Sequence, residues 1–162
     1  AETPRAASVF MKLVIQRVTS GGVKVDGQTV GSISKGVVCL VGIGRDDTED
    51  DAEWCCRRIL NARLWPNDDG KAWMTSVLQN NFQVLMVSQF TLHGYMNGNK
   101  PDFHLSMAPE PAKVLFDNLV TRVRKAHTAP DQVQEGVFGA YMEVSLVGDG
   151  PVTMNLDSKV RK

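Results

Sequence analysis

The sequence predicts an α+β domain built on a largely antiparallel, barrel-like β-sheet with two main helices. Strand patterns outnumber helical ones, and they follow one another in consecutive runs. A chain of 162 residues fits one domain with one core, since domains of this size bury roughly two thirds of the surface of the unfolded chain. No internal repeat or low-complexity segment divides it. We therefore expect a single domain over residues 11–158.

The first part of the chain is predicted to form strands. Patterned apolar segments cover residues 12–18, 23–25, 28–33 and 37–43. Asp26-Gly27 joins the second and third segments, and this pair favours a tight hairpin turn. The last segment is apolar throughout, which is typical of a central strand buried on both faces.

Two segments carry apolar residues at helical spacing. The first covers residues 48–64 and begins with a capping signal, Thr48 with Asp51 three residues later. The second covers residues 110–127, and its basic end complements the helix dipole. Its charged residues are expected to form a solvated face. Two cysteines on the first helix are expected to fill the core: Cys55 and Cys56.

The most abrupt change of character lies between residues 84 and 92. An apolar run from Val84 to Val87 predicts a strand buried on both faces, and Ser88, Gln89 and Thr91 follow where that strand should surface. Polar groups at such a junction are held still and can still reach a ligand. Taken alone, the stretch favours a second interpretation, in which these side chains only satisfy backbone groups or meet solvent.

The rest of the chain supplies a loop and the closing strands. Residues 93–99 are rich in glycine and asparagine and are expected to form a mobile loop of the kind that closes over ligands. Strands are expected over residues 141–147 and 152–156. Between them, Gly148-Asp149-Gly150-Pro151 has the composition of a turn.

Composition narrows the class of partner and compartment. Eighteen basic residues cancel eighteen acidic ones, so no field of the whole molecule would attract a polyanion or an anionic membrane. Three cysteines give neither a Cys-x-x-Cys pair nor a disulfide framework, which favours a reducing, cytoplasmic compartment. No apolar run approaches the ~20 residues of a membrane span, so no membrane partner is expected.

The two ends of the chain lack the pattern of the domain. Residues 1–10 carry no clear period, and the strongly patterned sequence begins at Met11. We expect residues 1–10 to be a disordered extension or an expression remnant. Residues 159–162 are expected to form a C-terminal tail.

Familiar catalytic and cofactor motifs are missing. There is no Gly-x-Ser-x-Gly elbow, no His-Glu-x-x-His pair and no glycine-rich phosphate loop before a helix. His93, His104 and His127 are not spaced as ligands from one element, so neither a metal nor a cofactor is expected. His93 or His104 could serve a serine or threonine nucleophile, but no acid stands in an obvious orienting position for either. A histidine in a polar loop is usually a solvated side chain.

Several short motifs, in a fixed order over residues 11–158, resemble the D-aminoacyl-tRNA deacylase family. The motifs are Gln16-Arg17-Val18, Val25-Asp26-Gly27 with Val30-Gly31, Ser88-Gln89-Phe90-Thr91-Leu92, Lys100-Pro101-Asp102-Phe103, Phe138-Gly139-Ala140-Tyr141-Met142 and Gly150-Pro151-Val152-Thr153. Any one of them would be weak, and the ordered set is strong. The sequence departs from the family at Gly148, where the family usually has asparagine.

The resemblance implies an enzyme of chiral proofreading that hydrolyses the ester between a D-amino acid and the terminal adenosine of tRNA. The implied partner is the 3′ end of aminoacyl-tRNA, and no cofactor is implied. The implied assembly is a homodimer with active sites at the subunit interface, in which the Gly-Pro pair of one subunit enters the pocket of the other. Whether glycyl-tRNA charged on a wrong tRNA is also a substrate is left open.

The resemblance places catalysis at Ser88, Gln89, Phe90 and Thr91. An aminoacyl ester is already activated and has a neighbouring ribose hydroxyl, so positioning and oxyanion stabilisation can hydrolyse it without a triad. The backbone N–H groups of Phe90 and Thr91 are the candidates for the oxyanion contact. A neutral threonine hydroxyl without a base is a poor nucleophile, so we expect Thr91 to position the substrate.

The resemblance also assigns residues to substrate binding. Gly150 and Pro151 would form a rigid wall against L side chains, held in a fixed direction if their peptide bond is cis. Arg17 would hold this segment, while Phe138 and Met142 would line the adenosine or aminoacyl pocket. For these last three residues, core packing or a surface ion pair is the competing interpretation.

Two functions of other classes stay open at this point. One is an RNA-binding module of the same fold that binds aminoacyl-tRNA ends without turnover. The other is a conventional esterase in which Ser88 or Thr91 acts with a histidine of the loop.

Overall fold

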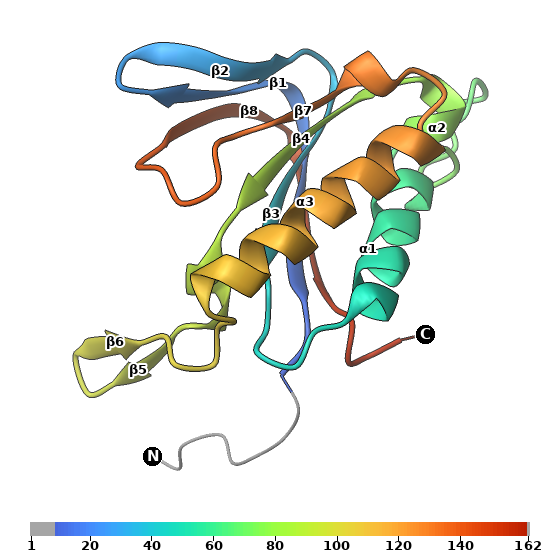
Figure 1. Cartoon of the computed structure of the whole chain (residues 1–162). Helices are drawn as coiled ribbons and strands as arrows, with labels where there is room; N and C mark the ends of the chain where they lie inside the picture. Colours follow the sequence, from blue (N-terminus) through green and yellow to red (C-terminus); the bar gives the residue numbers. More distant parts are fainter. Residues whose placement is uncertain (1–8, 162) are drawn as a thin grey trace.

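Six strands form a sheet in the order β2-β1-β3-β4-β7, with β8 paired to β1 (Figure 1). The computed structural model describes residues 9–161. A separate hairpin of β5 and β6 projects from this body. The strands are β1 (Lys12–Val25), β2 (Gln28–Ile33), β3 (Gly36–Gly42), β4 (Gln83–Ser88), β5 (Tyr95–Asn97), β6 (Lys100–Asp102), β7 (Val133–Glu135) and β8 (Glu143–Asp157). The helices are α1 (Glu49–Asn61), α2 (Val77–Asn80) and α3 (Pro109–Ala126), with 3-10 turns η1 (Phe90–His93) and η2 (Pro130–Gln132).

The predicted α+β class and barrel-like sheet are confirmed, and the pairing of the sheet is mixed. β1 runs antiparallel to β2, β3 and β8. In contrast, β4 runs parallel to both β3 and β7. Parallel neighbours need a long crossover connection, and this is the role of α1 between β3 and β4 and of α3 between β4 and β7. The two predicted helices therefore explain why the sheet is less antiparallel than expected.

Buried side chains cover both faces of the central strands β3 and β4, as their uninterrupted apolar runs predict. The larger cluster lies between the sheet and the helices α1 and α3. The smaller cluster joins residues of β1 to β4 on the other face. At Gly31 of β2, an added Cβ would lie 2.6 Å from the carbonyl oxygen of Glu135 on β7. A glycine here lets the two ends of the sheet approach, which nearly closes the barrel.

The strands β1 and β8 are each longer than predicted, because each joins two segments that the sequence pattern predicts as separate strands. β1 continues through residues 20–22, where it pairs with both β2 and β8. β8 continues through the predicted turn, and its residues 149–152 bulge from the ladder opposite Arg17 alone. The predicted loop over residues 93–99 instead contains the end of η1 and the strand β5.

Both long helices form where the apolar spacing predicts them. The Asp51 carboxylate accepts a hydrogen bond from the Thr48 backbone N–H at 2.9 Å, which confirms the capping signal at the start of α1. Cys55 and Cys56 are buried, as expected of core residues. Among residues 9–161, no helix has both the length and the apolar character needed to cross a membrane.

The ends of the described chain are tied to the α1 side of the domain. Residues 1–8 of the expected extension, and residue 162 of the expected tail, lie outside the described residues. Val9 donates its N–H to the Asp46 carboxylate at 2.7 Å and accepts the Asp46 N–H at 3.0 Å. At the other end, the Arg161 guanidinium donates to the carboxylates of Asp50 and Asp51 at 2.6 and 3.0 Å.

Candidate active site

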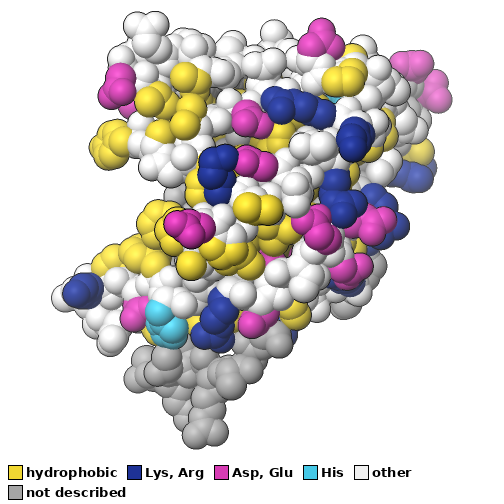
Figure 2. Space-filling model, in the orientation of Figure 1, with side chains coloured by type: hydrophobic (Ala, Val, Ile, Leu, Met, Phe, Trp, Pro, Cys, Tyr) yellow, Lys and Arg dark blue, Asp and Glu magenta, His cyan; other side chains and the backbone are white. Residues whose placement is uncertain are grey.

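A pocket of about 750 Å³ opens beside the end of β4. Its walls come from the ends of β3 and β4, from the segment that leads into α3, and from the segment between β7 and β8. Hydrophobic side chains gather in this hollow on the face shown in Figure 2. A mostly apolar pocket of this size with a few polar groups is suited to a small organic ligand. The predicted site residues that line it are Ser88, Gln89, Phe90, Phe138 and Met142.

The turn η1, directly after β4, presents backbone N–H groups at the pocket edge. The first hydrogen bond of the turn runs from the Leu92 N–H to the Gln89 carbonyl at 3.2 Å. The N–H groups of Phe90 and Thr91 come before Leu92, so they have no carbonyl partner within the turn. The Gln89 side-chain amide donates to Thr91 Oγ1. Ser106 Oγ donates to the Phe90 carbonyl at 3.1 Å and ties the turn to the opposite segment. Thr91 itself is exposed and does not line the pocket.

His93, which the sequence pattern predicts as a solvated loop side chain, is buried. Its Nε2 lies 3.0 Å from the Gly42 carbonyl oxygen, which can only accept, so Nε2 carries the proton. Burial lowers the pKa of His93 from its ordinary value of 6.5 and favours the neutral ring. His93 therefore fixes η1 on β3, and its Nε2 is not available as a base.

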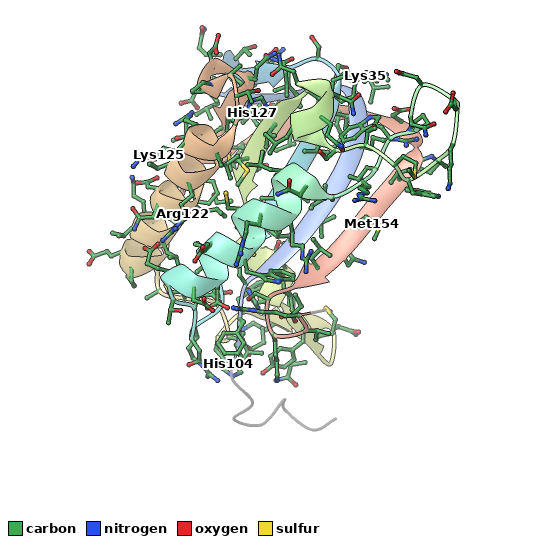
Figure 3. The ribbon with its side chains drawn as sticks, turned by 90° about the vertical axis from the view of Figure 1, so that its right-hand side faces the viewer. Lys35, His104, Arg122, Lys125, His127 and Met154 are labelled. Atoms are coloured by element: carbon green, nitrogen blue, oxygen red, sulfur yellow. The ribbon has the colours of Figure 1, made fainter. Side chains whose placement is uncertain are left out.

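His104 has an acidic partner that the sequence pattern did not reveal. Its Nδ1 lies 2.5 Å from Asp102 Oδ1 and 3.1 Å from the Tyr95 hydroxyl. The expectation that no acid orients either loop histidine is therefore wrong for His104, although His104 does not line the pocket. His104 and His127 lie at opposite ends of the molecule (Figure 3). Within residues 9–161, no three potential ligands come together to hold a metal.

Arg17 ties β1 to the bulge of β8 that carries Gly150 and Pro151. Its Nε donates to the Asp149 carbonyl at 3.1 Å and lies 3.4 Å from the Asp149 carboxylate. Its Nη1 donates to the Leu64 carbonyl at 2.5 Å. The Gly150-Pro151 peptide bond is cis. Both residues are exposed, and neither lines the pocket of the same chain.

Two parts of the pocket wall escaped the sequence-based prediction. One is the segment over residues 103–109, whose Phe103 ring packs edge-on against Phe90 with centroids 5.2 Å apart. The other is Tyr141, which is 93% exposed. Only their places within the family-like motifs pointed to Phe103 and Tyr141, because neither stands in a pattern that by itself indicates a ligand.

The chain is similar to known proteins over nearly all of its length. It is 49% identical over 150 residues to the D-aminoacyl-tRNA deacylase of Dictyostelium discoideum, covering 92% of this chain and 99% of that protein. It is 43% identical to the human D-aminoacyl-tRNA deacylase 1, covering 91% of this chain and 70% of that protein.

Solved structures share its fold. A structure named c-Myc DNA Unwinding Element Binding Protein is 42% identical with a TM-score of 0.86, covering 90% of this chain and 97% of that one. A probable eukaryotic D-amino acid tRNA deacylase, 17% identical with a TM-score of 0.78, covers 91% of this chain and 98% of its own. The family model described as D-Tyr-tRNA(Tyr) deacylase matches residues 14–157. The chain belongs to this deacylase family.

Proposed function

We propose that this protein hydrolyses the ester bond of D-aminoacyl-tRNA and releases free D-amino acid and tRNA. Family membership and the names of its relatives support this reaction. The pocket is the observation that assigns this reaction to particular residues. Ser88, Gln89 and Phe90 from the end of β4 meet Phe138 and Met142 from the β7–β8 segment around one cavity large enough for an aminoacyl nucleoside.

The chemistry we propose is positioning of an ester that is already activated. The ribose hydroxyl beside the ester assists the attack of water, and the N–H groups of Phe90 and Thr91 stabilise the oxyanion that forms. The Gln89 amide, bonded to Thr91 Oγ1, holds the turn in shape. A seryl or threonyl nucleophile would need a base within hydrogen-bond reach. His93 is committed to the Gly42 carbonyl, which counts against that esterase alternative.

The proposed enzyme is a homodimer in which each Gly150-Pro151 segment completes the pocket of its partner. Two observations support this arrangement: the segment lies outside its own pocket, and Arg17 holds it in a bulge of β8. Among residues 9–161, β8 pairs only with β1, so within this part of the chain no strand covers its other edge along 15 residues. A two-fold axis at this edge would cover it and bring the same surface of each subunit together.

Within such a dimer, Gly150 and Pro151 would discriminate by exclusion. D- and L-aminoacyl groups differ by exchange of a hydrogen and a side chain on one carbon. A rigid wall where the L side chain would lie therefore rejects one enantiomer by steric clash.

We place this enzyme in the cytoplasm, where aminoacyl-tRNA is used. Glycyl-tRNA has no side chain to clash, so it is the second substrate to assay.

Deacylation of matched D- and L-tyrosyl-tRNA by the purified protein tests the proposal. We expect rapid hydrolysis of the D-ester and slow hydrolysis of the L-ester. Equal rates would reject chiral proofreading. Tight binding of both without turnover would instead favour an RNA-binding module of the same fold. Loss of all activity in His104→Ala, with cleavage of small activated esters by the wild type, would favour the esterase.

A further inference from the structure

The β5–β6 hairpin projects away from the body of the domain (Figure 1). Phe90, before the hairpin, and Phe103, after it, both line the pocket. The Phe103 ring lies so close to Gly94, which precedes β5, that a Cβ there would come within 2.6 Å. The base of the hairpin and the pocket wall are therefore one continuous surface. A ligand that fills the pocket and continues outward on this side would meet the hairpin.

The hairpin carries ring and apolar groups that remain accessible. Tyr95 and His104 pack edge to face with centroids 5.6 Å apart, and His104 is exposed. Met96 is also exposed, as is Phe90 at the pocket edge. Unstacked bases of single-stranded RNA bind to aromatic and apolar side chains of this kind.

Cationic groups lie on the same surface. Lys100 is exposed, and its charge helps to lower the pKa of the neighbouring Asp102. Arg45 lies beside the base of the hairpin, since its N–H donates to the Leu105 carbonyl at 3.0 Å. Its side chain is half-exposed and only loosely paired with Asp46, at 3.8 Å. Accessible cations next to aromatic rings are the combination that binds a phosphodiester strand.

His104 adds a group suited to a ribose. Its hydrogen bonds lower the pKa of Asp102, so this carboxylate is ionised and accepts the proton on Nδ1 of His104. In the neutral ring, Nε2 is then an acceptor, and no residue in the described range hydrogen-bonds to it. A ribose 2′-hydroxyl is the donor that distinguishes RNA from DNA.

The opposite wall of the pocket is less suited to a phosphodiester strand. Tyr141 is highly exposed there, but its neighbour in β8 is Glu143, which faces Lys24 across the strand pair. On the same side, Arg124 is already paired with Glu135 of β7 at 3.3 Å. The charges on this side therefore balance one another.

We infer that the surface formed by Arg45, Tyr95, Met96, Lys100 and His104 binds the single-stranded nucleotides that precede the terminal adenosine of tRNA. This inference rests on the proposed function, because it takes the pocket as the site of that adenosine and its aminoacyl group. The hairpin then contributes to the affinity for tRNA and leaves the chemistry in the pocket unchanged.

Two substrates, D-tyrosyl-tRNA and D-tyrosyl-adenosine, have the same ester in the pocket, but only the tRNA has nucleotides that could reach the hairpin. Comparing them separates binding at the hairpin from an effect on the pocket. Lys100→Glu and Tyr95→Ala should each lower kcat/KM for D-tyrosyl-tRNA about tenfold, through KM. The same variants should hydrolyse D-tyrosyl-adenosine at the wild-type rate. Lys125→Glu, the same charge change at the C-terminal end of α3, away from the hairpin (Figure 3), is the matched control and should act like wild type on both substrates.

Direct binding makes the test independent of turnover. Fluorescence anisotropy with an RNA oligonucleotide that ends in CCA should show weaker binding to Lys100→Glu, with a salt dependence reduced by about one unit of slope. Equal binding to wild type and variant would overturn the inference, as would an equal loss on both substrates. A loss specific to tRNA in Tyr141→Ala but not in Tyr95→Ala would also overturn it. If the wild type hydrolyses neither substrate, the proposed function fails, and the anisotropy result alone decides the docking.

Discussion

Thr91 Oγ1 accepts a hydrogen bond from the Gln89 side-chain amide, and no carboxylate or imidazole in the described chain hydrogen-bonds to that hydroxyl. Without a base, the hydroxyl can position a substrate but is a poor nucleophile. We expect Thr91→Ala to lower kcat about a hundredfold, the scale of a misplaced substrate. Loss of a true nucleophile would be about a millionfold.

The substrate supplies the control for this prediction. D-Tyrosyl-tRNA in which hydrogen replaces the hydroxyl beside the ester should be hydrolysed far more slowly by wild-type protein. Single-turnover kinetics measure both effects. Undiminished hydrolysis of the deoxy substrate, together with an acyl group trapped on Thr91 or Ser88, would restore the side-chain nucleophile.

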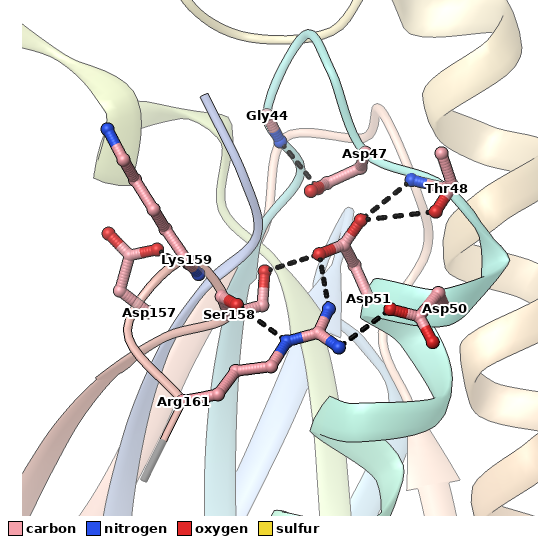
Figure 4. Close-up of polar contacts among 9 residues, drawn as sticks. All are labelled: Gly44, Asp47, Thr48, Asp50, Asp51, Asp157, Ser158, Lys159 and Arg161. Atoms are coloured by element: carbon pink, nitrogen blue, oxygen red, sulfur yellow. Dashed lines mark hydrogen bonds and ion pairs between the residues drawn. The ribbon is translucent and has the colours of Figure 1, made fainter. Parts of the chain in front are cut away.

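Asp47 lies buried before α1, where its carboxylate accepts the Gly44 N–H at 2.8 Å (Figure 4). Burial raises the pKa of Asp47 from 3.8 to about 8, and the nearby charges of Asp51 and Asp157 add to this effect. The folded protein therefore holds a proton between these pH values that the unfolded chain releases. For this group, the free energy of unfolding falls as pH rises through that window, by about 1.4 kcal/mol per pH unit.

Asparagine at position 47 stays neutral and keeps a carbonyl oxygen for the Gly44 N–H. Asp47→Asn should therefore gain stability relative to wild type as pH rises from 5 to 8, and the gain should level off above pH 8. Denaturant unfolding at several pH values measures it. Asp50→Asn removes a charge from the exposed side of the same helix end and is the control. Parallel pH curves for Asp47→Asn and wild type would contradict the assignment.

At the scale of single residues, the sequence indicated which side chains were chemically able to act but not their surroundings. Ser88, Gln89 and Thr91 could be singled out because polar groups follow an apolar run, whereas Phe90 was indicated only by the resemblance to the family. The burial of His93 and the pairing of His104 with Asp102 could not, since both depend on how η1 and the hairpin fold back. Short polar segments carry no period that predicts such folding.

At the scale of elements, period and caps predicted the helices and the central strands well. The prediction was wrong for the length of strands that depend on pairing with a neighbouring strand. Residues 20–22 of β1 include two glycines, yet they remain in the strand because β2 and β8 lie on either side. Likewise, residues 148–151 have turn composition, but the pairing of the residues on both sides with β1 limits the irregularity to a bulge over residues 149–152.

The backbone of the bulge in β8 requires glycine at Gly150 but not at the nearby Gly148. Gly150 has φ +126, and an added Cβ would lie 3.0 Å from Val152 and 3.2 Å from Arg17 Nη2. At Gly148, an added Cβ meets nothing within 4 Å. Gly150→Ala should therefore lower the free energy of unfolding by at least about 1 kcal/mol and reduce the D over L ratio of kcat/KM. Gly148→Asn, the usual family residue, should change neither by much. Equal effects of the two substitutions would show that the local backbone does not matter.

At the scale of the whole molecule, the open edge of β8 predicts how subunits associate. Val147 on β8 and Val114 on α3 are similarly exposed, at 56% and 60%. A lysine at a buried two-fold contact would lie near its own copy and repel it. Val147→Lys should therefore shift the protein toward monomer in sedimentation velocity, while Val114→Lys should sediment as wild type. A fully active monomeric wild type would contradict the proposed dimer.

Complementation tests whether the Gly-Pro segment acts in the partner's pocket. Ala108→Trp would fill the pocket from its exposed rim and leave Gly150-Pro151 intact, whereas Gly150→Ala damages the segment and leaves the pocket intact. If the segment acts in trans, a heterodimer of the two variants has one site with an intact pocket and an intact wall. Random pairing of co-expressed chains makes half of the dimers heterodimers, so about a quarter of the wild-type sites should work. If the segment serves its own chain, every site keeps one defect, and the co-expressed mixture should be no more stereospecific than the two variants measured separately.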